Sequence, residues 1–519
     1  MNWEMRLDTT RLSTTMTPAF DNSYARLPDE FFAKLSPVAV SEPRLIRGNK
    51  RVADLLGLDS GFLDSAEGLE ILAGNHVPQG AEPLAMVYAG HQFGGFAPQL
   101  GDGRAILLGE LIGNDDNRYD LQLKGSGRTP YSRGGDGRAW VGPILREYIV
   151  SEAMHALGVP TTFALAAVST GEPVLRDGYM PGALLVRVAR SHVRVGTFEF
   201  FASRRDTDSL KTLADYAINR LYPDVAEADN PAHALLDTVI DKTAKLVAHW
   251  QGVGFVHGVM NTDNTNISGE TIDYGPCAFL DTYSAGKVFS SIDHMGRYAF
   301  ANQPGIAQWN LSMLAQCLMP LMDSDDDKAL EMAQASIDAY PACFAKYYLP
   351  TMRKKLGLQT ETAEDGNLIK ELLSTMESGS ADFTTTFRAL ASVANSATSD
   401  SFDKVRESAA AENFLQQFSD SGSVQQQATI WLQNWYNRSA QEETDGDARN
   451  ILMMQNNPAV IPRNHRIEEA IRAATDGDFS PFEKLVAVLE KPFEETPENN
   501  QYQLPPEPVE TVTRTFCGT

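Results

Sequence analysis

The chain has 519 residues, 43% of them hydrophobic, and a formal net charge of −24. This length exceeds that of one simple domain, and the apolar content is sufficient to bury large cores. The acidic balance argues against nonspecific binding to nucleic acid or to an anionic membrane, because phosphates are repelled outside a local basic patch. We therefore expect partners other than nucleic acid and membranes.

The cysteines and the first residues bear on the compartment. The four cysteines show no CxxC spacing, which predicts neither a disulfide framework nor structural zinc. The start, MNWEMRLDTTRLSTT, lacks the apolar region of a signal peptide. No apolar run approaches the roughly 20 residues that span a bilayer. These features predict a cytoplasmic protein.

The pattern along the chain predicts four segments. They are a flexible N-terminal tail (1–19), a strand-rich N-lobe (20–195), a larger helical C-lobe (196–490) and an extended C-terminal tail (491–519) rich in Pro, Glu and Asn. The fold class is thus α+β.

Near its start the N-lobe contains RLIRGNKRVADLLGL and GLEILAGN, which we interpret as short helices joined by turns. RAILLGELI and RYDLQLK then predict a hairpin closed by GNDDN. A helical stripe over 139–157 follows, and TTFALAAVST, EPVLRDG and ALLVRVARSH predict three further strands. In the C-lobe, DSLKTLADYAINRLY and HALLDTVIDKTAKLVAHWQ predict amphipathic helices.

A small strand-rich lobe followed by a helical lobe is typical of a protein kinase. Such a lobe needs a lysine on a strand and a helix glutamate that orients it. Lys124 ends the strand YDLQLK, and Glu147 lies on the helix that follows. The glycines of GHQFGG match neither the GxGxxG nor the Walker spacing, so they are weak evidence for a phosphate loop.

The stretch HGVMNTDNTNISGETIDYG, residues 257–275, supplies the remaining landmarks. Asp263 is a candidate proton acceptor, and the oxygens of Asn264 and Asp273 suit Mg²⁺. Each residue also has a structural interpretation: DYG alone is more often a turn, and His257 is more often a core histidine bonded to a backbone carbonyl. Asp263 and Asn264 are adjacent and no HRD is present, which departs from an ordinary protein kinase.

Arginine dominates the basic residues between positions 101 and 200. Only one lysine, Lys124, occurs there, beside ten arginines: 104, 118, 128, 133, 138, 146, 176, 187, 190 and 194. The planar guanidinium matches phosphate oxygens, so this bias is compatible with a phosphate pocket. The alternative, that arginines solvate the surface and pair with neighbouring acids, applies to about half of them.

Five long motifs resemble the selenoprotein O family over nearly the whole chain from about residue 20. They are FDNSYARLP, YAGHQFGGFAPQLGDGRAILLGE, DLQLKGSGRTPYSRGGDGRA, REYIVSEAMHALGVPTT and HGVMNTDNT. The resemblance implies a two-lobed, protein-kinase-like fold. It also implies a protein adenylyltransferase that moves AMP from ATP to Ser, Thr or Tyr hydroxyls, with ATP reversed relative to kinases. Self-modification is expected as well.

The same resemblance implies roles for individual residues. Asp263 is the proton acceptor, Asn264 and Asp273 hold Mg²⁺, and Glu147 pairs with Lys124. The implied ATP contacts are Gly101, Gly103, Arg104, Lys124, Asp136, Gly137, Arg187, Arg194 and Asp273. Mn²⁺ and UTP are alternatives to Mg²⁺ and ATP that the sequence leaves open.

Two further activities also stay open: a phosphotransferase that uses the same residues, and a nucleotide-binding pseudokinase scaffold without catalysis. Cys517 stands where the family has selenocysteine, which excludes selenium chemistry. Cys277 follows the DYG turn, and two interpretations remain for this pair. They form a reversible disulfide that tethers the tail, or they are unrelated thiols with Cys277 buried as a small hydrophobe.

Overall fold

The computed structural model describes residues 18–396 and 401–515. The chain is mixed α/β and divides into two compact units. Unit 1 consists of the chain up to Met86 together with Asp102–Trp140 and Ala164–Arg190, and unit 2 consists of Val87–Gly101, Val141–Phe163 and everything after Arg190. Among the described helices, none combines the length and apolar composition of a membrane span.

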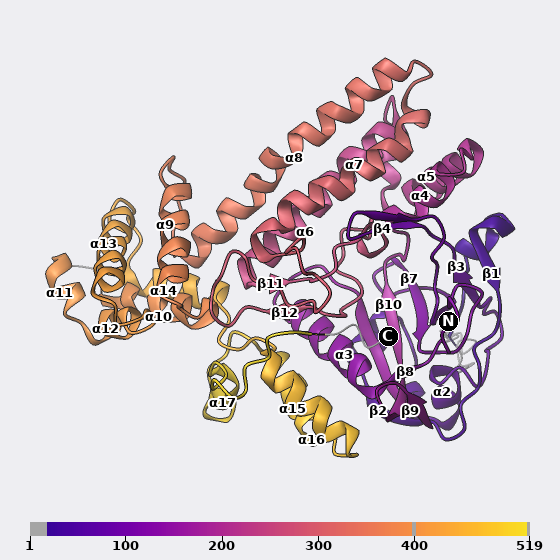
Figure 1. The fold of residues 1–519 in the computed structure, drawn as a ribbon, viewed down its shortest axis with the longest axis horizontal. Helices are drawn as coiled ribbons and strands as arrows, with labels where there is room; N and C mark the ends of the chain where they lie inside the picture. The colour runs from indigo at the N-terminus through magenta and orange to yellow at the C-terminus, as the bar shows by residue number, and fades with distance from the viewer. Residues whose placement is uncertain (1–17, 397–400, 516–519) are drawn as a thin grey trace, which may run out of the picture. The chain divides into compact units, whose positions relative to one another are not determined.

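Unit 1 is built on an eight-stranded sheet with the strand order β1-β3-β6-β7-β10-β9-β2, to which β8 adds by pairing with β10 (Figure 1). Its strands are β1 (Phe32–Lys34), β2 (Arg44–Gly48), β3 (Leu84–Met86), β6 (Ala105–Ile112), β7 (Arg118–Lys124), β8 (Ala139–Trp140), β9 (Phe163–Leu175) and β10 (Tyr179–Ala189). Two short helices accompany it, α1 (Lys50–Leu55) and α2 (Ala66–Leu72).

The predicted hairpin is confirmed as β6 and β7, which pair antiparallel from Ala105↔Lys124 to Ile112↔Arg118. Both strands are buried along almost their whole length, as expected for central strands covered on both faces.

Two predictions for unit 1 were wrong. RLIRG is not helical but forms the edge strand β2, because it pairs with β9 in a register that includes Leu45↔Val168. Sheet pairing overrides local propensity here, and the helix α1 begins only at Lys50, after its N-cap Asn49. In addition, three predicted strands are two, because β9 continues through Gly171 at φ +72° instead of ending there. A left-handed glycine bends a strand without ending it.

Unit 2 is mainly helical, with two small antiparallel pairs: β4 (Gly90–Gln92) with β5 (Gly95–Ala97), and β11 (Phe255–Val256) with β12 (Ala278–Phe279). Its helices are α3 (Val141–Ala156), α4 (Val195–Ala202), α5 (Thr207–Leu221), α6 (Pro231–Val253), α7 (Gln303–Met322), α8 (Asp326–Lys355), α9 (Asp365–Ser378), α10 (Phe383–Ser396), α11 (Phe402–Arg406), α12 (Ala409–Leu415), α13 (Gly422–Ser439), α14 (Gly446–Asn456), α15 (Asn464–Thr475), α16 (Ser480–Leu489) and α17 (Asn500–Gln503).

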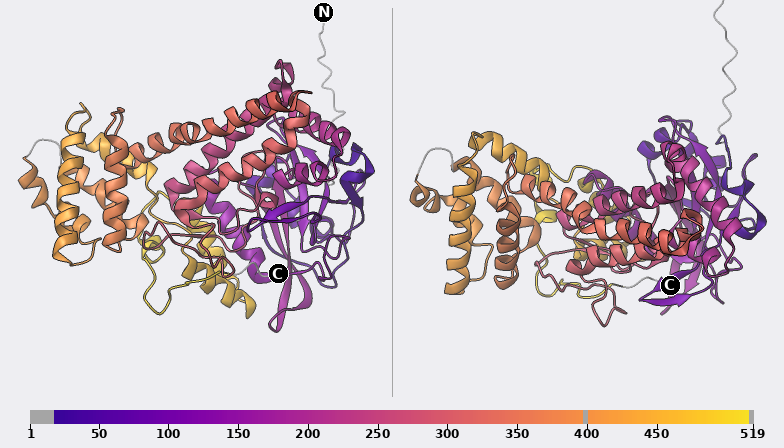
Figure 2. Two further views of the ribbon diagram at one scale, coloured as in Figure 1. Left: turned by 45° about the horizontal axis from the view of Figure 1, so that its top comes forward. Right: turned by 90° about the horizontal axis from the view of Figure 1, so that it is seen from above.

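The predicted helices over 208–222 and 233–251 are confirmed as α5 and α6, and the stripe over 139–157 as α3. Helices α6, α7 and α8 lie side by side in every view (Figure 1, Figure 2). A hydrophobic core lies among α9 to α14 and includes the buried Trp431 and Trp435. Their indole N–H groups donate to the backbone carbonyls of Leu368 (2.8 Å) and Leu356 (2.9 Å). Within unit 2, α3 packs on α15 and α16 through Tyr148 against Phe482, with ring centroids 5.5 Å apart.

Candidate active site

The 257–275 loop is held at both ends by the short β11–β12 pair. Helix α6 ends at Val253, and its C-cap Gly254, with φ +73°, turns the chain into β11. His257 is 1% exposed, and its Nε2 donates to the carbonyl of Ile272 across the loop (3.0 Å). Its burial lowers its pKa. His257 is therefore the predicted core histidine, and it fixes the loop that carries Asp263 and Asp273.

Asp263 lies in the 3₁₀ turn Thr262–Asn264 and is buried, with 8% of its surface exposed. Its Oδ2 accepts a hydrogen bond from the side-chain amide of Gln92 (3.2 Å). Its Oδ1 is buried and receives no hydrogen bond from any residue that the structure describes. Burial raises the pKa of Asp263 to about 6, although the positive charge of Arg194 and the Gln92 bond oppose the rise. A carboxylate that titrates near neutrality suits general base catalysis.

Two glycines make room for this carboxylate. A Cβ atom on Gly90 would lie 2.8 Å from Oδ1 of Asp263, and one on Gly196 would lie 2.2 Å from the carbonyl oxygen of Ala89. The segments of these glycines are joined by the hydrogen bond from the Ala89 N–H to the Gly196 carbonyl (2.9 Å). A larger side chain would displace the side chain of Asp263 if placed at Gly90, and the backbone beside Asp263 if placed at Gly196.

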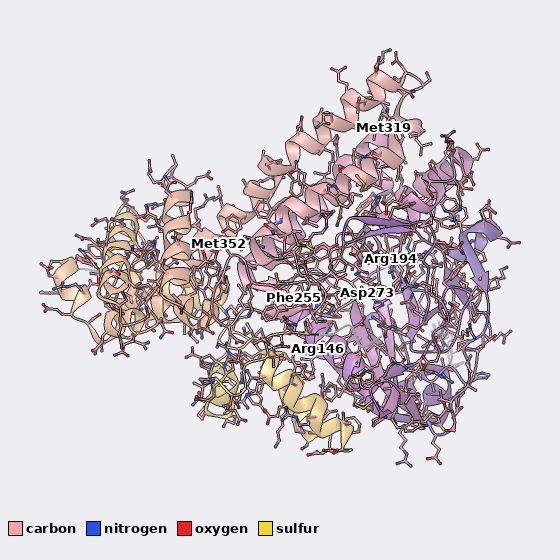
Figure 3. All side chains as sticks on the ribbon, in the orientation of Figure 1. Arg146, Arg194, Phe255, Asp273, Met319 and Met352 are labelled. Carbon is pink, nitrogen blue, oxygen red and sulfur yellow. The ribbon has the colours of Figure 1, made fainter. Side chains whose placement is uncertain are left out.

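Arg194 couples the two acids of the loop and directly precedes α4. Its Nη1 donates to the backbone carbonyl of Asp263 (2.9 Å) and to Oδ2 of Asp273 (3.2 Å), and Figure 3 labels Arg194 and Asp273. The guanidinium also lies over the ring of Tyr88, 4.5 Å from its centroid. Since Arg194 is only 2% exposed, these contacts fix its position. A buried, oriented cation beside a general base is well placed to stabilise negative charge.

Asp273 and Asn264 offer oxygen ligands to a cation. Asp273 has φ +62°, a strained left-handed conformation for a non-glycine residue, and its side chain is 20% exposed. The amide nitrogen of Asn264 donates to the carbonyl of Val259 (3.0 Å), so its Oδ1 is the atom left to bind a ligand. Within 18–396 and 401–515, no group of three His, Cys, Asp or Glu side chains could hold a metal ion.

These ligands nevertheless fit Mg²⁺, because that ion binds through one or two carboxylates and keeps waters and phosphate oxygens in its other positions. The unsatisfied Oδ1 of Asp263 adds a third hard oxygen atom on the same loop.

A second layer of hydrogen bonds holds the Thr262–Asn264 turn from the β4 side. Thr262 Oγ1 accepts from the N–H of His91 (2.6 Å) and donates to the carboxylate of Glu199. The same carboxylate binds Nδ1 of His91 (2.5 Å). The side-chain oxygen of Asn261 accepts from the Tyr298 hydroxyl (2.7 Å). Such outer contacts lock the geometry of a site.

Unit 1 carries most of the ATP contacts that the sequence predicts. Gln122 and Arg187 are cross-strand partners in β7 and β10, and Lys124 lies two residues beyond Gln122 on the same face of the sheet. Arg187 is 2% exposed, and both its Nε (3.1 Å) and its Nη2 (2.6 Å) donate to Oε1 of Gln122. The amide of Gln122 in turn donates to Asp102 (3.2 Å). The structure thus brings Lys124 and Arg187 together on one face.

The two glycine-rich loops of LGDGR and GGDGRA contain the other predicted ATP contacts. Gly101 (φ +125°) and Gly137 (φ +69°) both have left-handed backbones, and a Cβ atom on Gly137 would lie 2.0 Å from the carbonyl oxygen of Gly127. The hydroxyl of Thr129 donates to the backbone carbonyl of Asp102 (2.7 Å), which ties the segment before GGDGRA to the LGDGR loop.

Charged residues of these loops differ in their pairing. Asp136 is paired with Arg176 (2.9 Å), and the hydrogen bond from Arg176 lowers its pKa. Arg104 Nη1 is buried without a partner among the described residues. Gly103 is confined, because a Cβ atom there would lie 2.9 Å from the carbonyl oxygen of Tyr131. Glu147, on α3, is 2% exposed and belongs to unit 2.

Comparison with known proteins decides the family. The family model "Protein adenylyltransferase SelO" matches residues 14–490. The chain belongs to the SelO family. It is 56% identical over 501 residues to the protein nucleotidyltransferase YdiU of Rhodopseudomonas palustris strain BisB5, which covers 96% of this chain and 99% of the relative. The YdiU proteins of Bradyrhizobium diazoefficiens (55%; 96% and 99% covered) and Rhizobium johnstonii (54%; 96% and 97% covered) are similar.

Membership of the SelO family makes the chain a protein nucleotidyltransferase, as the motifs predicted. The roles of single residues, the pairing of Lys124 with Glu147 and the segment boundaries stay predictions.

Sequence reasoning missed Gln92, His91 and Glu199. The glycines of GHQFGG are weak evidence for a phosphate loop, whereas in the structure β4 and β5 form a hairpin whose Gln92 donates to Asp263. The polar pair His91-Gln92 between glycines was the available signal.

Proposed function

We propose that this SelO-family chain transfers AMP from ATP to Ser, Thr or Tyr hydroxyls of proteins in an Mg²⁺-dependent reaction, with ATP reversed relative to kinases. The observation that carries the proposal is the buried carboxylate of Asp263. Its pKa is raised to about 6, its Oδ1 accepts no hydrogen bond from the described residues, and Arg194 is fixed beside it. A scaffold without catalysis does not need an acid of this kind.

In the proposed step, Asp263 accepts the proton of the acceptor hydroxyl. The acceptor oxygen forms a bond to the α-phosphorus, the bond from that phosphorus to the β-phosphate bridging oxygen breaks, and diphosphate leaves. The rigid turn around Asp263 contributes by holding the base in place, so that little reorganisation is needed when the proton moves.

Asn264 and Asp273 are the proposed ligands of the ion, with Mn²⁺ as the alternative to Mg²⁺. When bound, the ion neutralises phosphate charge. The hydrogen bond from Arg194 to Asp273 orients that carboxylate (3.2 Å). Because Asn264 is anchored through its amide nitrogen to Val259, its oxygen is oriented as well.

The proposed orientation of ATP follows from the charges that the family resemblance assigns to it. Lys124 and Arg187 on the sheet and Arg194 beside the 257–275 loop supply fixed positive charge for the inner phosphates. Binding the γ-phosphate inward leaves the α-phosphorus for the acceptor. The remaining proposed contacts are Gly101, Gly103, Arg104, Asp136, Gly137 and Asp273, with Glu147 positioning Lys124.

A phosphotransferase would use the same residues and differ only in the phosphorus that is attacked. The test is therefore incubation of the full chain and an acceptor protein with ATP labelled at the α-phosphate or, in a parallel reaction, at the γ-phosphate. We expect label from the α-position in acceptor protein and in the enzyme itself, and none from the γ-position. Incorporation from the γ-position alone would establish the phosphotransferase, and no incorporation from either would favour the scaffold.

A further inference from the structure

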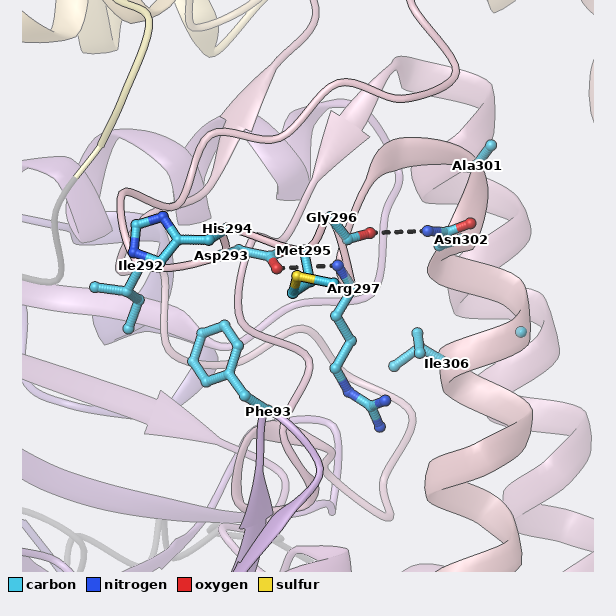
Figure 4. A pocket seen from close by; sticks show the side chains of 11 residues that line it. Phe93, Ile292, Asp293, His294, Met295, Gly296, Arg297, Ala301, Asn302 and Ile306 are labelled. Atoms are coloured by element: carbon cyan, nitrogen blue, oxygen red, sulfur yellow. Dashed lines mark hydrogen bonds between the residues drawn. The ribbon is translucent and has the colours of Figure 1, made fainter.

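A groove of about 690 Å³ lies in unit 2 between the tip of the β4–β5 hairpin, the segment after β12 and the start of α7 (Figure 4). We call it the 292–306 groove, and its lining includes Phe93, Ile292, Met295, Arg297 and Ile306. Its volume is sufficient for several side chains of a ligand.

The β4–β5 hairpin connects the groove to the base. Gln92, whose amide holds Asp263, is the immediate neighbour of Phe93, which lines the groove. The N–H of Phe93 also donates to Oδ1 of Asn261 (3.2 Å) and to the hydroxyl of Tyr298 (3.1 Å). Since consecutive Cα atoms are about 3.8 Å apart, a chain that presents a hydroxyl to Asp263 reaches the groove within a few residues.

The groove contains a positive charge, Arg297, that forms no ion pair with a carboxylate of the described residues. The guanidinium of Arg297 lies over the ring of Trp309, 4.6 Å from its centroid, and its Nε is buried without a partner in the described part of the chain. Figure 4 shows this side chain extending toward the space between Phe93 and Ile306. The nearby acid Asp293 binds backbone instead of this guanidinium. Its carboxylate accepts hydrogen bonds from the backbone N–H groups of Arg297 (2.9 Å) and Tyr298 (2.8 Å).

Apolar side chains border this cation. Ile292 is 60% exposed and Met295 is 92% exposed, which are unusual values for large apolar residues beside a cavity. Methionine is unbranched and adapts to differently shaped apolar partners. A surface that combines adaptable apolar contacts with one guanidinium that forms no ion pair within the described residues complements a peptide that carries an apolar and an acidic side chain.

We propose that the 292–306 groove binds the acceptor protein next to its modified hydroxyl, with an Asp or Glu carboxylate at Arg297 and an apolar side chain against Ile292 and Met295. This inference rests on the proposed function and deepens it, since it specifies the chemistry of the acceptor. The enzyme then selects hydroxyls that have an acid and an apolar residue within a few positions.

The test measures equilibrium binding without any transfer reaction. Fluorescein-labelled peptides carry a central Thr, with one Leu and one Glu moved through the flanking positions, and matched sets replace Glu by Gln or Lys. We expect the full chain to bind the best Glu peptide roughly tenfold more tightly than its Lys analogue in fluorescence anisotropy. Arg297→Glu should reverse this preference, and Met295→Ser should weaken both peptides alike.

Arg472→Glu, at an exposed arginine of α15, is the charge-matched control and should leave the preference unchanged. Arg297→Gln provides a milder variant, which should abolish the preference, and circular dichroism verifies that each variant is folded. Equal affinity for Glu and Lys peptides, or a Glu preference that survives in Arg297→Glu, would overturn the inference. So would displacement of the peptide by ATP together with weakened ATP binding in Arg297→Glu, which would place the nucleotide in the groove.

The two proposals fail separately. Label from the γ-position of ATP would refute AMP transfer, while the anisotropy measurement would still decide what the groove selects. Conversely, AMP transfer without any acidic preference would refute the groove assignment alone.

Discussion

Two buried acids of unit 2 show how their surroundings separate a structural role from a chemical one. Asp365, at the start of α9, accepts from Arg438 Nε (2.7 Å), from the Thr362 N–H (3.0 Å) and from the Thr362 hydroxyl (2.8 Å). Burial acts to raise its pKa, but these bonds outweigh burial and the pKa is lowered. Among the described residues, Asp263 accepts a side-chain hydrogen bond from Gln92 alone, and burial raises its pKa to about 6.

The difference lies in what each arginine binds. Arg438 points its Nε at the carboxylate of Asp365, and its Nη1 binds Glu442 (3.1 Å), so the charges of this region neutralise one another. Arg194 instead binds the backbone carbonyl of Asp263 and leaves the carboxylate to Gln92. A buried acid with incomplete hydrogen bonding costs stability and gains reactivity, which marks it as functional.

The largest effect should come from removing the acids of the site. Asp273→Ala should abolish transfer and weaken ATP binding in Mg²⁺, because a metal ligand is lost. Asp263→Ala should leave ATP binding nearly intact and slow transfer by roughly 10² to 10⁴-fold, the usual contribution of a positioned base. Transfer of α-label and ATP titration measure the two effects separately. Full activity in Asp263→Ala would remove the base assignment.

Replacing the two acids by amides should change the free energy of unfolding in opposite directions. At pH 7 the folded chain holds Asp263 ionised despite a pKa above the unfolded value, so Asp263→Asn should raise the free energy of unfolding by roughly 1 to 2 kcal/mol. Asp365→Asn should lower it by about 3 kcal/mol, because Arg438 loses its buried partner.

Thermal unfolding of both variants tests this contrast, and its dependence on pH gives the sign independently. The destabilisation caused by ionised Asp263 should disappear as the pH falls from about 6 toward the pKa of Asp263 in the unfolded chain, since the folded state then binds the proton. The contribution of Asp365 should be lost only at lower pH, below its unfolded value. Equal shifts in both variants would contradict the comparison.

The pH dependence of transfer should report the ionisation of Asp263. Because the base acts in its deprotonated form, the rate should fall about tenfold per pH unit below roughly 6 and level off above it. Gln92→Leu removes the hydrogen bond that lowers this pKa, so the acidic limb should move to higher pH. An unmoved limb in Gln92→Leu would show that another group limits the rate.

The sequence predicted those parts of the site that lie close together along the chain. Asp263, Asn264, Asp273 and the structural His257 occupy one loop, and their spacing was readable. Gln92 was missed because 171 positions separate it from Asp263, and only folding brings them together. RLIRG was likewise misjudged, since its strand state depends on pairing with β9, more than a hundred residues away.

The smallest effect concerns Cys277 and Cys517. Cys277 is 0% exposed, and Cys517 lies outside the described residues. The chain nevertheless approaches Cys277 from the C-terminal side, because Thr515 Oγ1 donates to the carbonyl of Pro276 (2.6 Å) and its N–H to that of Phe289 (2.8 Å). Two residues span at most about 7 Å, which is compatible with the Cα separation of a disulfide.

Burial of Cys277 means that a bridge requires local opening, so we expect slow formation of the disulfide and a change in the transfer rate of only a few fold. Transfer rates of the native chain, Cys517→Ser and the control Cys343→Ser would be compared under oxidised and reduced conditions, with nonreducing peptide mapping of the bridge. A redox response that persists unchanged in Cys517→Ser, or the absence of a linked peptide, would leave Cys277 as a buried thiol with only a packing role.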